Sequence, residues 1–228
     1  MSGRLVLLRH GQSHSNVERC LDTRPPGASL TPAGIAQARD FTRGFERPAG
    51  MLVHSVALRA RQTASVIGEV WKIRPHEVEG LHEAQVGELE MRNDDEAVDA
   101  FHEVYERWHS GDLDAALPGG ETGAQVMGRY LPVLSDLRMR YLDDHEWTGD
   151  IVVVSHGAAI RLAVATLAGV NGSFVVEHHI SNAESVVLAP ITDGRWSCVH
   201  WGQLSPPFLP DPRGMPRPDE LESADPMG

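Results

Sequence analysis

Two apolar runs in the sequence each end at a histidine that is followed by a glycine. The run over residues 5–8 leads into Arg9 and His10, and the run over residues 151–154 leads through a serine into His156. An imidazole can act as a nucleophile or as a general base, and a glycine beside it lets a ligand come close to the backbone. The two histidines are therefore candidate catalytic residues.

Arginines accompany these histidines. Arg9 directly precedes the first of them, and a third apolar run, over residues 51–53, leads to Arg59. Guanidinium groups bind the oxygens of a phosphate in forks, and their charge disfavours the cationic form of a nearby imidazole. A neutral histidine in such a group can attack phosphorus and form a phosphohistidine. Glu83 is the nearest candidate carboxyl group to protonate the leaving oxygen.

The elements that must position these residues follow from the hydrophobic pattern. Short, continuous apolar runs suit strands buried on both faces of a parallel sheet. The pattern predicts an α/β fold of three layers, with a mostly parallel central sheet flanked by helices and with ligands beyond the carboxyl ends of the strands. The predicted strands cover residues 5–8, 51–53, 76–79, 151–154, 186–191 and 196–201, the last two as an antiparallel hairpin, and the predicted helices begin near residues 31, 59, 93, 122 and 158.

Two segments interrupt this alternation. Residues 84–118 are acidic and contain a predicted helix through Trp108, so we expect a helical insertion over the carboxyl-end edge of the sheet. Residues 205–228 are rich in proline and polar residues, and such a segment buries too little apolar surface to offset the entropy of ordering. The sequence therefore predicts one domain over residues 1–204, followed by a loosely held tail.

Composition narrows the class of protein. The formal net charge of −12 argues against a surface for nucleic acid or for anionic membranes. The apolar runs are too short for a signal peptide or a spanning helix. Cys20 and Cys198 have no metal-ligand spacing and allow at most one bridge. We expect a cytoplasmic protein with reduced thiols, no metal or other cofactor and a small phosphorylated substrate, whereas the sequence leaves a homo-oligomeric state open.

The residues around His10 match a known signature. Residues 9–16, Arg-His-Gly-Gln-Ser-His-Ser-Asn, resemble the R-H-G-x-S-x-x-N motif of the histidine phosphatase superfamily, the clan of phosphoglycerate mutases and related phosphatases. Five fixed positions would match by chance in about one chain in ten thousand of this length. Further blocks follow in the family's order, at residues 30–38, 55–64, 81–87, 119–122 (Gly-Gly-Glu-Thr) and 155–157, so that the resemblance covers about residues 4–200.

The resemblance implies a role for each matched residue. It makes His10 the nucleophile and Glu83 the proton donor. The catalytic residues that it implies are His10, Glu83, His156, Arg9 and Arg59. It implies that Arg9, Asn16, Arg59 and His156 form the phosphate pocket. Further candidates for binding the phosphate are Gln12, Ser13 and Gly157.

The sequence also departs from the family pattern. Val56 stands where the family usually has proline, which leaves the charge of the pocket unchanged. Residues 89–91, Leu-Glu-Met, replace an aromatic-Glu-Gly turn after Glu83. Residues 20–28 do not resemble the glycine-tryptophan substrate loop of the mutases, and the chain is shorter than mutases usually are.

These observations favour a metal-independent phosphomonoesterase that acts on a small phosphorylated metabolite through a phosphohistidine. A mutase, which returns the phosphoryl group to a sugar-acid hydroxyl, is the closest alternative. A non-catalytic phosphate-binding module of the same fold is a third hypothesis. It predicts a broken catalytic position, yet Arg9, His10, Arg59 and His156 are all present.

Overall fold

A sheet of six strands forms the centre of the computed structural model, which describes residues 3–210 and 225–228. The strands are β1 (Leu5–Arg9), β2 (Met51–His54), β3 (His76–Glu77), β4 (Ile151–Ser155), β5 (Ser185–Pro190) and β6 (Trp196–Trp201). Their order across the sheet is β3-β2-β4-β1-β5-β6. The first four of this order pair in parallel, whereas β5 pairs antiparallel with both β1 and β6, so the sheet is mixed and the predicted hairpin is confirmed.

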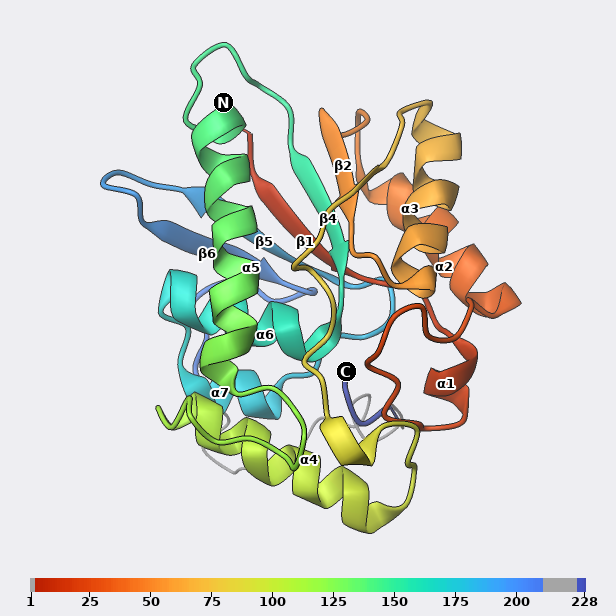
Figure 1. Ribbon diagram of the computed structural model, residues 1–228. Coiled ribbons are helices and arrows are strands. Elements are labelled where there is room, and N and C mark those ends of the chain that lie inside the picture. The colour runs from red at the N-terminus through yellow and green to blue at the C-terminus, as the bar shows by residue number, and fades with distance from the viewer. Residues whose placement is uncertain (1–2, 211–224) are drawn as a thin grey trace.

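Helices cover both faces of the sheet (Figure 1). One face carries α2 (Pro32–Phe41) and α3 (Leu58–Trp71), and the other carries α5 (Gly123–Leu137) and α6 (Gly157–Ala168). The remaining helices are α1 (His14–Val17), α4 (Asp95–His109) and α7 (Gly172–Glu177), and short helical turns cover Thr42–Gly44, Gly87–Leu89 and Arg138–Leu142. The predicted α/β fold of three layers is therefore confirmed.

The alternation of side chains along β1 explains why both faces are covered. Leu5 and Leu7 are buried in the core that contains α5 and α6, whereas Val6 and Leu8 are buried in the core that contains α3. Every residue of the strand is buried. A parallel strand that faces water on neither side has a continuously apolar sequence, which is the pattern that predicted this strand.

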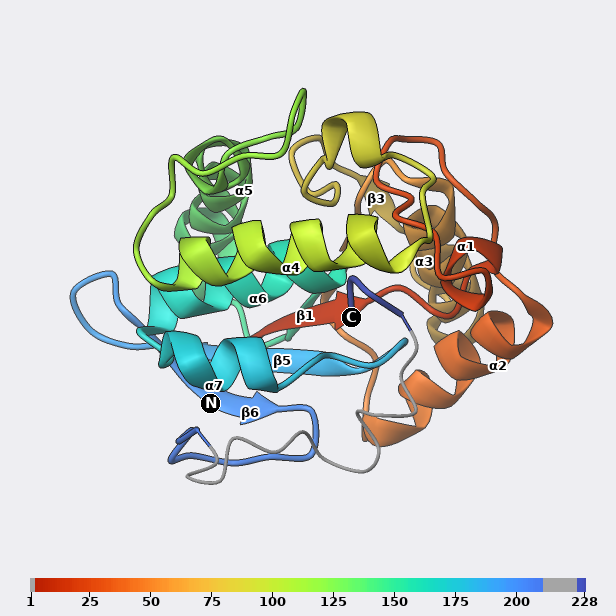
Figure 2. The ribbon, with the colours of Figure 1, turned by 90° about the horizontal axis from the view of Figure 1, so that it is seen from below.

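Helix α4 crosses the end of the molecule at which β1 ends (Figure 2). It begins at an N-cap, because the Asp94 side chain accepts from the N–H of Ala97 at 3.2 Å. Its buried face, which includes Phe101, Tyr105 and Trp108, packs against α6 and α7. Helix α4 therefore forms a wall beside the carboxyl ends of the central strands.

The end of the sequence lies beside the same strand ends. Residues 211–224 of the predicted tail lie outside the described residues, whereas Asp225 and Met227 are buried, with exposed fractions of 7% and 6%. For residues 225–228 the structure differs from the prediction of a loosely held tail. The physical reason is that these residues are held by polar contacts, and the prediction considered apolar burial alone.

Three further properties concern the whole described part of the chain. None of its helices is long and apolar enough to cross a membrane. Cys20 and Cys198 are both buried and both free, so no disulfide joins them. Within residues 3–210 and 225–228, no group of three or more His, Cys, Asp or Glu side chains is arranged to hold a metal ion.

Candidate active site

The predicted catalytic residues meet at the carboxyl ends of β1 and β4. Arg9 is the last residue of β1 and pairs in register with Ser155, the last residue of β4. The backbone N–H of His10 donates to the Ser155 carbonyl at 3.0 Å, which extends the pairing of the strands by one residue. The rings of His10 and His156 consequently meet edge to face, with centroids 5.2 Å apart.

His10 is buried with its Nε2 lone pair directed at an arginine. Its Nδ1 lies 2.8 Å from the carbonyl oxygen of Gly11, which can only accept, so this hydrogen bond assigns the ring proton to Nδ1 and the lone pair to Nε2. Arg59 Nε donates to that lone pair at 3.0 Å. Burial and the positive charges of Arg59 and Arg9 hold the pKa of His10 well below its usual range. The surroundings thus favour a neutral, nucleophilic imidazole.

Asp22, which the sequence analysis did not single out, holds Arg59 in this position. Arg59 Nη2 donates to the Asp22 carbonyl at 2.8 Å, and Arg59 Nη1 lies 3.5 Å from the Asp22 carboxylate. That carboxylate also accepts from the Ser15 hydroxyl at 2.7 Å and from the Ala28 N–H at 2.8 Å. Burial lowers the pKa of Arg59, and the charge of Asp22 opposes this effect. The loop over residues 20–28, in which no motif was found, therefore forms part of the site.

His156 is fully buried before the start of α6. Its Nε2 lies 2.9 Å from the hydroxyl of Ser55, and that hydroxyl oxygen also accepts from the Ala57 N–H at 3.3 Å. When the Ser55 hydroxyl donates to Nε2, the ring proton is on Nδ1. Nδ1 has no partner among the described residues. Burial and the charge of Arg59 hold the pKa of His156 well below its usual range, so the ring is neutral, and in this tautomer Nδ1 is a donor for a ligand oxygen.

Arg9 and Asn16 share one anionic partner, Asp225. Arg9 Nη1 donates to the Ile180 carbonyl at 2.7 Å, and Arg9 Nη2 pairs with the Asp225 carboxylate. Asn16 Nδ2 donates to the same carboxylate oxygen at 2.6 Å. Asn16 Oδ1 accepts from the Ser13 N–H at 2.8 Å in the capping box of α1, so the NH₂ of the amide is directed into the pocket.

Glu83 lies between β3 and α4, with its carboxyl group at the start of α6. Oε1 accepts from the N–H groups of Ala84 at 2.8 Å and Ala159 at 2.9 Å, and Oε2 accepts from the Ala158 N–H at 3.1 Å. One acceptor position on Oε2 is left for a proton. Burial raises the pKa of Glu83, and the three N–H groups oppose this without reversing it. A buried carboxyl group with a raised pKa is suited to donate a proton.

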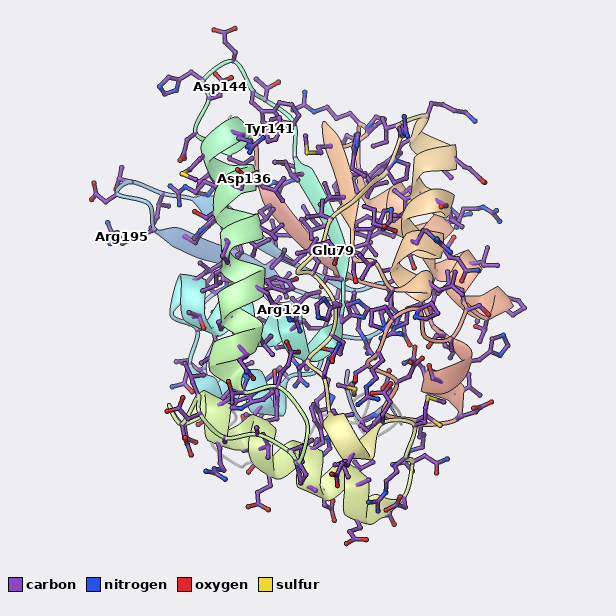
Figure 3. The ribbon with its side chains drawn as sticks, in the orientation of Figure 1. Glu79, Arg129, Asp136, Tyr141, Asp144 and Arg195 are labelled. Carbon is purple, nitrogen blue, oxygen red and sulfur yellow. The ribbon has the colours of Figure 1, made fainter. Side chains whose placement is uncertain are left out.

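Arg129 on α5 holds the segment that carries Glu83 (Figure 3). Its Nη1 donates to the carbonyls of Gly80 at 2.8 Å and His82 at 2.6 Å, and its Nη2 donates to the carbonyl of Glu83 at 2.9 Å. The Glu121 carboxylate accepts from Arg129 Nε at 2.8 Å and from Nη2 at 2.7 Å. Glu121 belongs to the Gly-Gly-Glu-Thr block of the family. Through Glu121, that block holds Arg129 in place, and Arg129 in turn holds the backbone of Glu83.

Three other residues implied by the resemblance have different surroundings. The Gln12 side chain accepts from the Thr31 hydroxyl at 2.9 Å, at the start of α2, and Ser13 caps α1. Neither residue lines the cavity beside His10, and His156 does not line it either. Gly157 begins α6, where a Cβ would lie 2.1 Å from the Met227 carbonyl oxygen. Gln12 and Ser13 thus shape the loop after β1, and Gly157 leaves room at the edge of the pocket.

The cavity between four of the predicted catalytic residues, Arg9, His10, Arg59 and Glu83, is almost full. It is lined by Arg9, His10, Ser15, Asn16, Cys20, Asp22, Arg59, Glu83, Asp225 and Met227. The centres of water-sized spheres can occupy about 10 Å³ of it, which is about the room for one water molecule. A wider cavity of about 710 Å³ lies beside α2, β1 and β5, but His200 is the one histidine among its lining residues. The chemistry assigns the candidate active site to the smaller cavity.

Comparison with known proteins agrees with this geometry. The sequence profile of the histidine phosphatase superfamily (branch 1) matches residues 5–204, which include every candidate residue from Arg9 to Gly157. The chain belongs to the histidine phosphatase superfamily. The family predicted from the motifs is therefore confirmed.

Relatives within this superfamily are phosphatases and mutases. A candidate phosphoserine phosphatase from Hydrogenobacter thermophilus is 27% identical over 181 residues, which cover 79% of this chain and 86% of the relative. A 2,3-bisphosphoglycerate-dependent phosphoglycerate mutase from Methylobacterium radiotolerans is 29% identical, with 80% of this chain and 87% of the relative covered. The solved structure of a mycobacterial glucosyl-3-phosphoglycerate phosphatase in complex with VO3 is similar with a TM-score of 0.74 and 25% identity, over 88% of this chain and 99% of that chain.

Proposed function

We propose that this protein is a phosphomonoesterase that hydrolyses a small phosphorylated metabolite through a phosphohistidine on His10. The observation that carries the proposal is the meeting of a neutral histidine, two arginines and a buried carboxyl group with a raised pKa in one cavity. Phosphatases among the relatives support the same activity. A module that only binds phosphate has no use for a proton donor beside the phosphate.

In the first step, His10 Nε2 attacks phosphorus. Before the attack, the Arg59 Nε–H must exchange its hydrogen bond to His10 Nε2 for one to a phosphate oxygen. This frees the lone pair of Nε2. The P–N bond forms while the P–O bond to the leaving group breaks, and Glu83 gives its proton to the leaving oxygen. The Gly11 carbonyl, which accepts from Nδ1, stabilises the positive charge on the phosphorylated ring. The donors to the phosphate oxygens are Arg9, Arg59, Asn16 and His156.

In the second step, water attacks the phosphohistidine. Glu83, now a carboxylate, accepts a proton from the water as the new P–O bond forms. The P–N bond breaks, and His10 recovers its lone pair on Nε2. Inorganic phosphate leaves with every group of the enzyme in its starting protonation state.

Mutase-type transfer is the second candidate, because a phosphoglycerate mutase is among the relatives. Both reactions share the phosphohistidine and differ in the acceptor, which is water for a phosphatase and a substrate hydroxyl for a mutase. A phosphatase turns over without a bisphosphate primer. Strict dependence on such a primer would identify the protein as a mutase.

The test of the proposed function is a screen of phosphorylated metabolites against the purified protein, run with and without a metal chelator. We expect release of inorganic phosphate at the same rate in both series, because arginines and histidines here supply the charge stabilisation that a metal ion supplies in other phosphatases. Activity that chelation removes and that zinc or magnesium restores would contradict this mechanism. A screen without any hydrolysed ester would contradict the function itself.

Arg129→Met should slow formation of the phosphoenzyme from an alkyl phosphate by about tenfold, because the backbone that carries Glu83 loses its hydrogen bonds to the guanidinium. Formation from nitrophenyl phosphate should change far less, since nitrophenolate leaves without a proton. Rapid quench with each substrate measures both rates.

Arg140→Met is the matched control for Arg129. It removes an exposed guanidinium that pairs with Asp136 near the carboxyl end of α5, and it should leave both rates within about twofold of wild type. Equal losses with both substrates in Arg129→Met would assign Arg129 to folding rather than to the position of Glu83.

A further inference from the structure

The Asp225 carboxylate stands where the proposed mechanism places a phosphate oxygen. Its Oδ2 accepts from Arg9 Nη2 and from Asn16 Nδ2, two of the donors assigned to the phosphate. Guanidinium and amide N–H groups bind carboxylate and phosphate oxygens with the same geometry. Asp225, a residue of the same chain, therefore occupies the phosphate pocket as a ligand would.

The residues that follow Asp225 in the sequence make contacts of their own. The whole segment therefore lies at the pocket, and not the Asp225 carboxylate alone. The Met227 N–H donates to Asp225 Oδ1 at 3.1 Å, which closes a turn at the mouth of the pocket. His102 Nε2, on α4, lies 3.0 Å from the Pro226 carbonyl oxygen, and the Met227 carbonyl rests on Gly157 at the start of α6. The segment Asp225–Gly228 is thus held by β1, α1, α4 and α6, and Figure 2 shows its end beside the carboxyl end of β1.

The segment and a phosphate ester cannot occupy the pocket together. With the segment in place, the centres of water-sized spheres can occupy only about 10 Å³ of the pocket, which is room for about one water molecule and not for a phosphoryl group. Both ligands also need the same N–H groups of Arg9 and Asn16. Binding of one must therefore displace the other.

We propose that Asp225–Gly228 is an autoinhibitory segment that competes with phosphate esters for the active site. The proposal rests on the proposed function for the identity of the competing ligand, and on the contacts of Asp225, Pro226 and Met227 for the position of the segment. Because the segment belongs to the same chain, even a weak carboxylate contact acts at an effective concentration of the order of millimolar. A phosphoryl group carries more charge and more acceptor oxygens than a carboxylate, so a substrate can displace the segment.

Competition of this kind has a defined consequence for affinity. Ligand binds the fraction of molecules in which the pocket is empty, so the apparent dissociation constant is the intrinsic one divided by that fraction. The segment raises the apparent Kd for inorganic phosphate and the KM for a substrate by the same factor. Removal of the Asp225 charge should lower both.

The test compares full-length wild-type protein with Asp225→Asn, which keeps the size of the side chain and removes its charge. We expect the Kd for inorganic phosphate, measured by calorimetry, to fall by about tenfold. Asp99→Asn removes an exposed carboxylate from α4 and is the matched control for net charge; its Kd should stay within about twofold of wild type. An unchanged or higher Kd in Asp225→Asn would overturn the proposal, because Asp225 would then assist binding or play no part in it.

A second variant and a peptide extend the test. Deletion of residues 225–228 should lower the Kd for phosphate as Asp225→Asn does. The acetylated and amidated peptide Ser-Ala-Asp-Pro-Met-Gly, which carries the Asp225 carboxylate alone, should weaken phosphate binding to the deleted protein at millimolar concentration, and the Asn version should not. Absence of competition by the Asp peptide at that concentration would overturn the proposal.

Failure of this proposal and failure of the proposed function give different results. Phosphate binding is measured without turnover. Tighter binding in Asp225→Asn, together with no hydrolysis of any ester, would retain the autoinhibitory segment and reject the phosphatase. Normal hydrolysis with unchanged phosphate binding in Asp225→Asn would reject the segment and retain the phosphatase.

Discussion

Replacing His10 by alanine should lower kcat for phosphate ester hydrolysis by about 10⁴- to 10⁶-fold, as loss of a covalent nucleophile does in other enzymes. Ser15 and Cys20 also line the cavity; the Ser15 hydroxyl donates to Asp22, and a thiolate of Cys20 would be the stronger nucleophile of the two. Burial and the charges of Glu18 and Asp22 raise the pKa of its thiol, so little thiolate is available to replace the imidazole.

Phosphoenzyme labelling measures the effect directly. Wild-type protein quenched after a short reaction with radiolabelled substrate should carry a label that is labile in acid and stable in base, and His10→Ala should carry none. His14→Ala is the matched control, because His14 lies exposed in the same signature, and it should label as wild type does. A label that persists in His10→Ala would assign the nucleophile to another residue.

Glu83→Gln should reduce formation of the phosphoenzyme from an alkyl phosphate by roughly 100-fold or more, the usual magnitude of general acid catalysis. Glutamine keeps the size of the side chain and its hydrogen bonds to Ala84 and Ala159, but it has no proton to transfer. An alkoxide is strongly basic and needs that proton, whereas nitrophenolate is a comparatively stable anion. Formation from nitrophenyl phosphate should therefore change far less.

The formation step must be measured alone by rapid quench, because the proposed mechanism also uses Glu83 to activate water in the second step. Glu88→Gln, an exposed carboxyl group a few residues along, is the matched control and should leave the rate unchanged. Equal losses with both leaving groups in Glu83→Gln would count against Glu83 as the general acid.

The raised pKa of Glu83 also predicts how the rate of phosphoenzyme formation depends on pH. Because burial raises this pKa, the acid form persists to higher pH than in an exposed carboxyl group. The wild-type rate of formation from an alkyl phosphate should fall as pH rises through that pKa, since the proton donor is then lost. Glu83→Gln has no proton to lose there, so its slower rate should not show this fall.

The fold was largely predictable because its central strands are buried on both faces. The runs before His10 and His156 are continuously apolar for that reason, and both were predicted as strands. Helices α1 and α7 were not predicted, since they have 4 and 6 residues and such short helices depend on contacts made in the folded chain. The Thr122 capping box was predicted because its signal lies within four residues.

The candidate site was predictable as far as its residues belong to local motifs. Arg9, His10, Arg59 and His156 lie in such motifs, and the structure brings them together. Asp22, Arg129 and Asp225 were missed, because each acts through a contact with a residue far away in the sequence. Glu121 lies in a block that matches the family, so the sequence marked it. The sequence did not show that Glu121 pairs with Arg129, the arginine that holds the backbone of Glu83.

The pairing of His10 with Ser155 places the proposed nucleophile on the part of the fold that opens least. The His10 N–H closes a hydrogen bond at the end of the β1–β4 ladder, and this ladder lies in the centre of the sheet. Amide hydrogens in such positions exchange with solvent chiefly through global unfolding. The exchange rate of the His10 amide therefore reports the stability of the whole domain, and the catalytic imidazole keeps its place for as long as the chain stays folded.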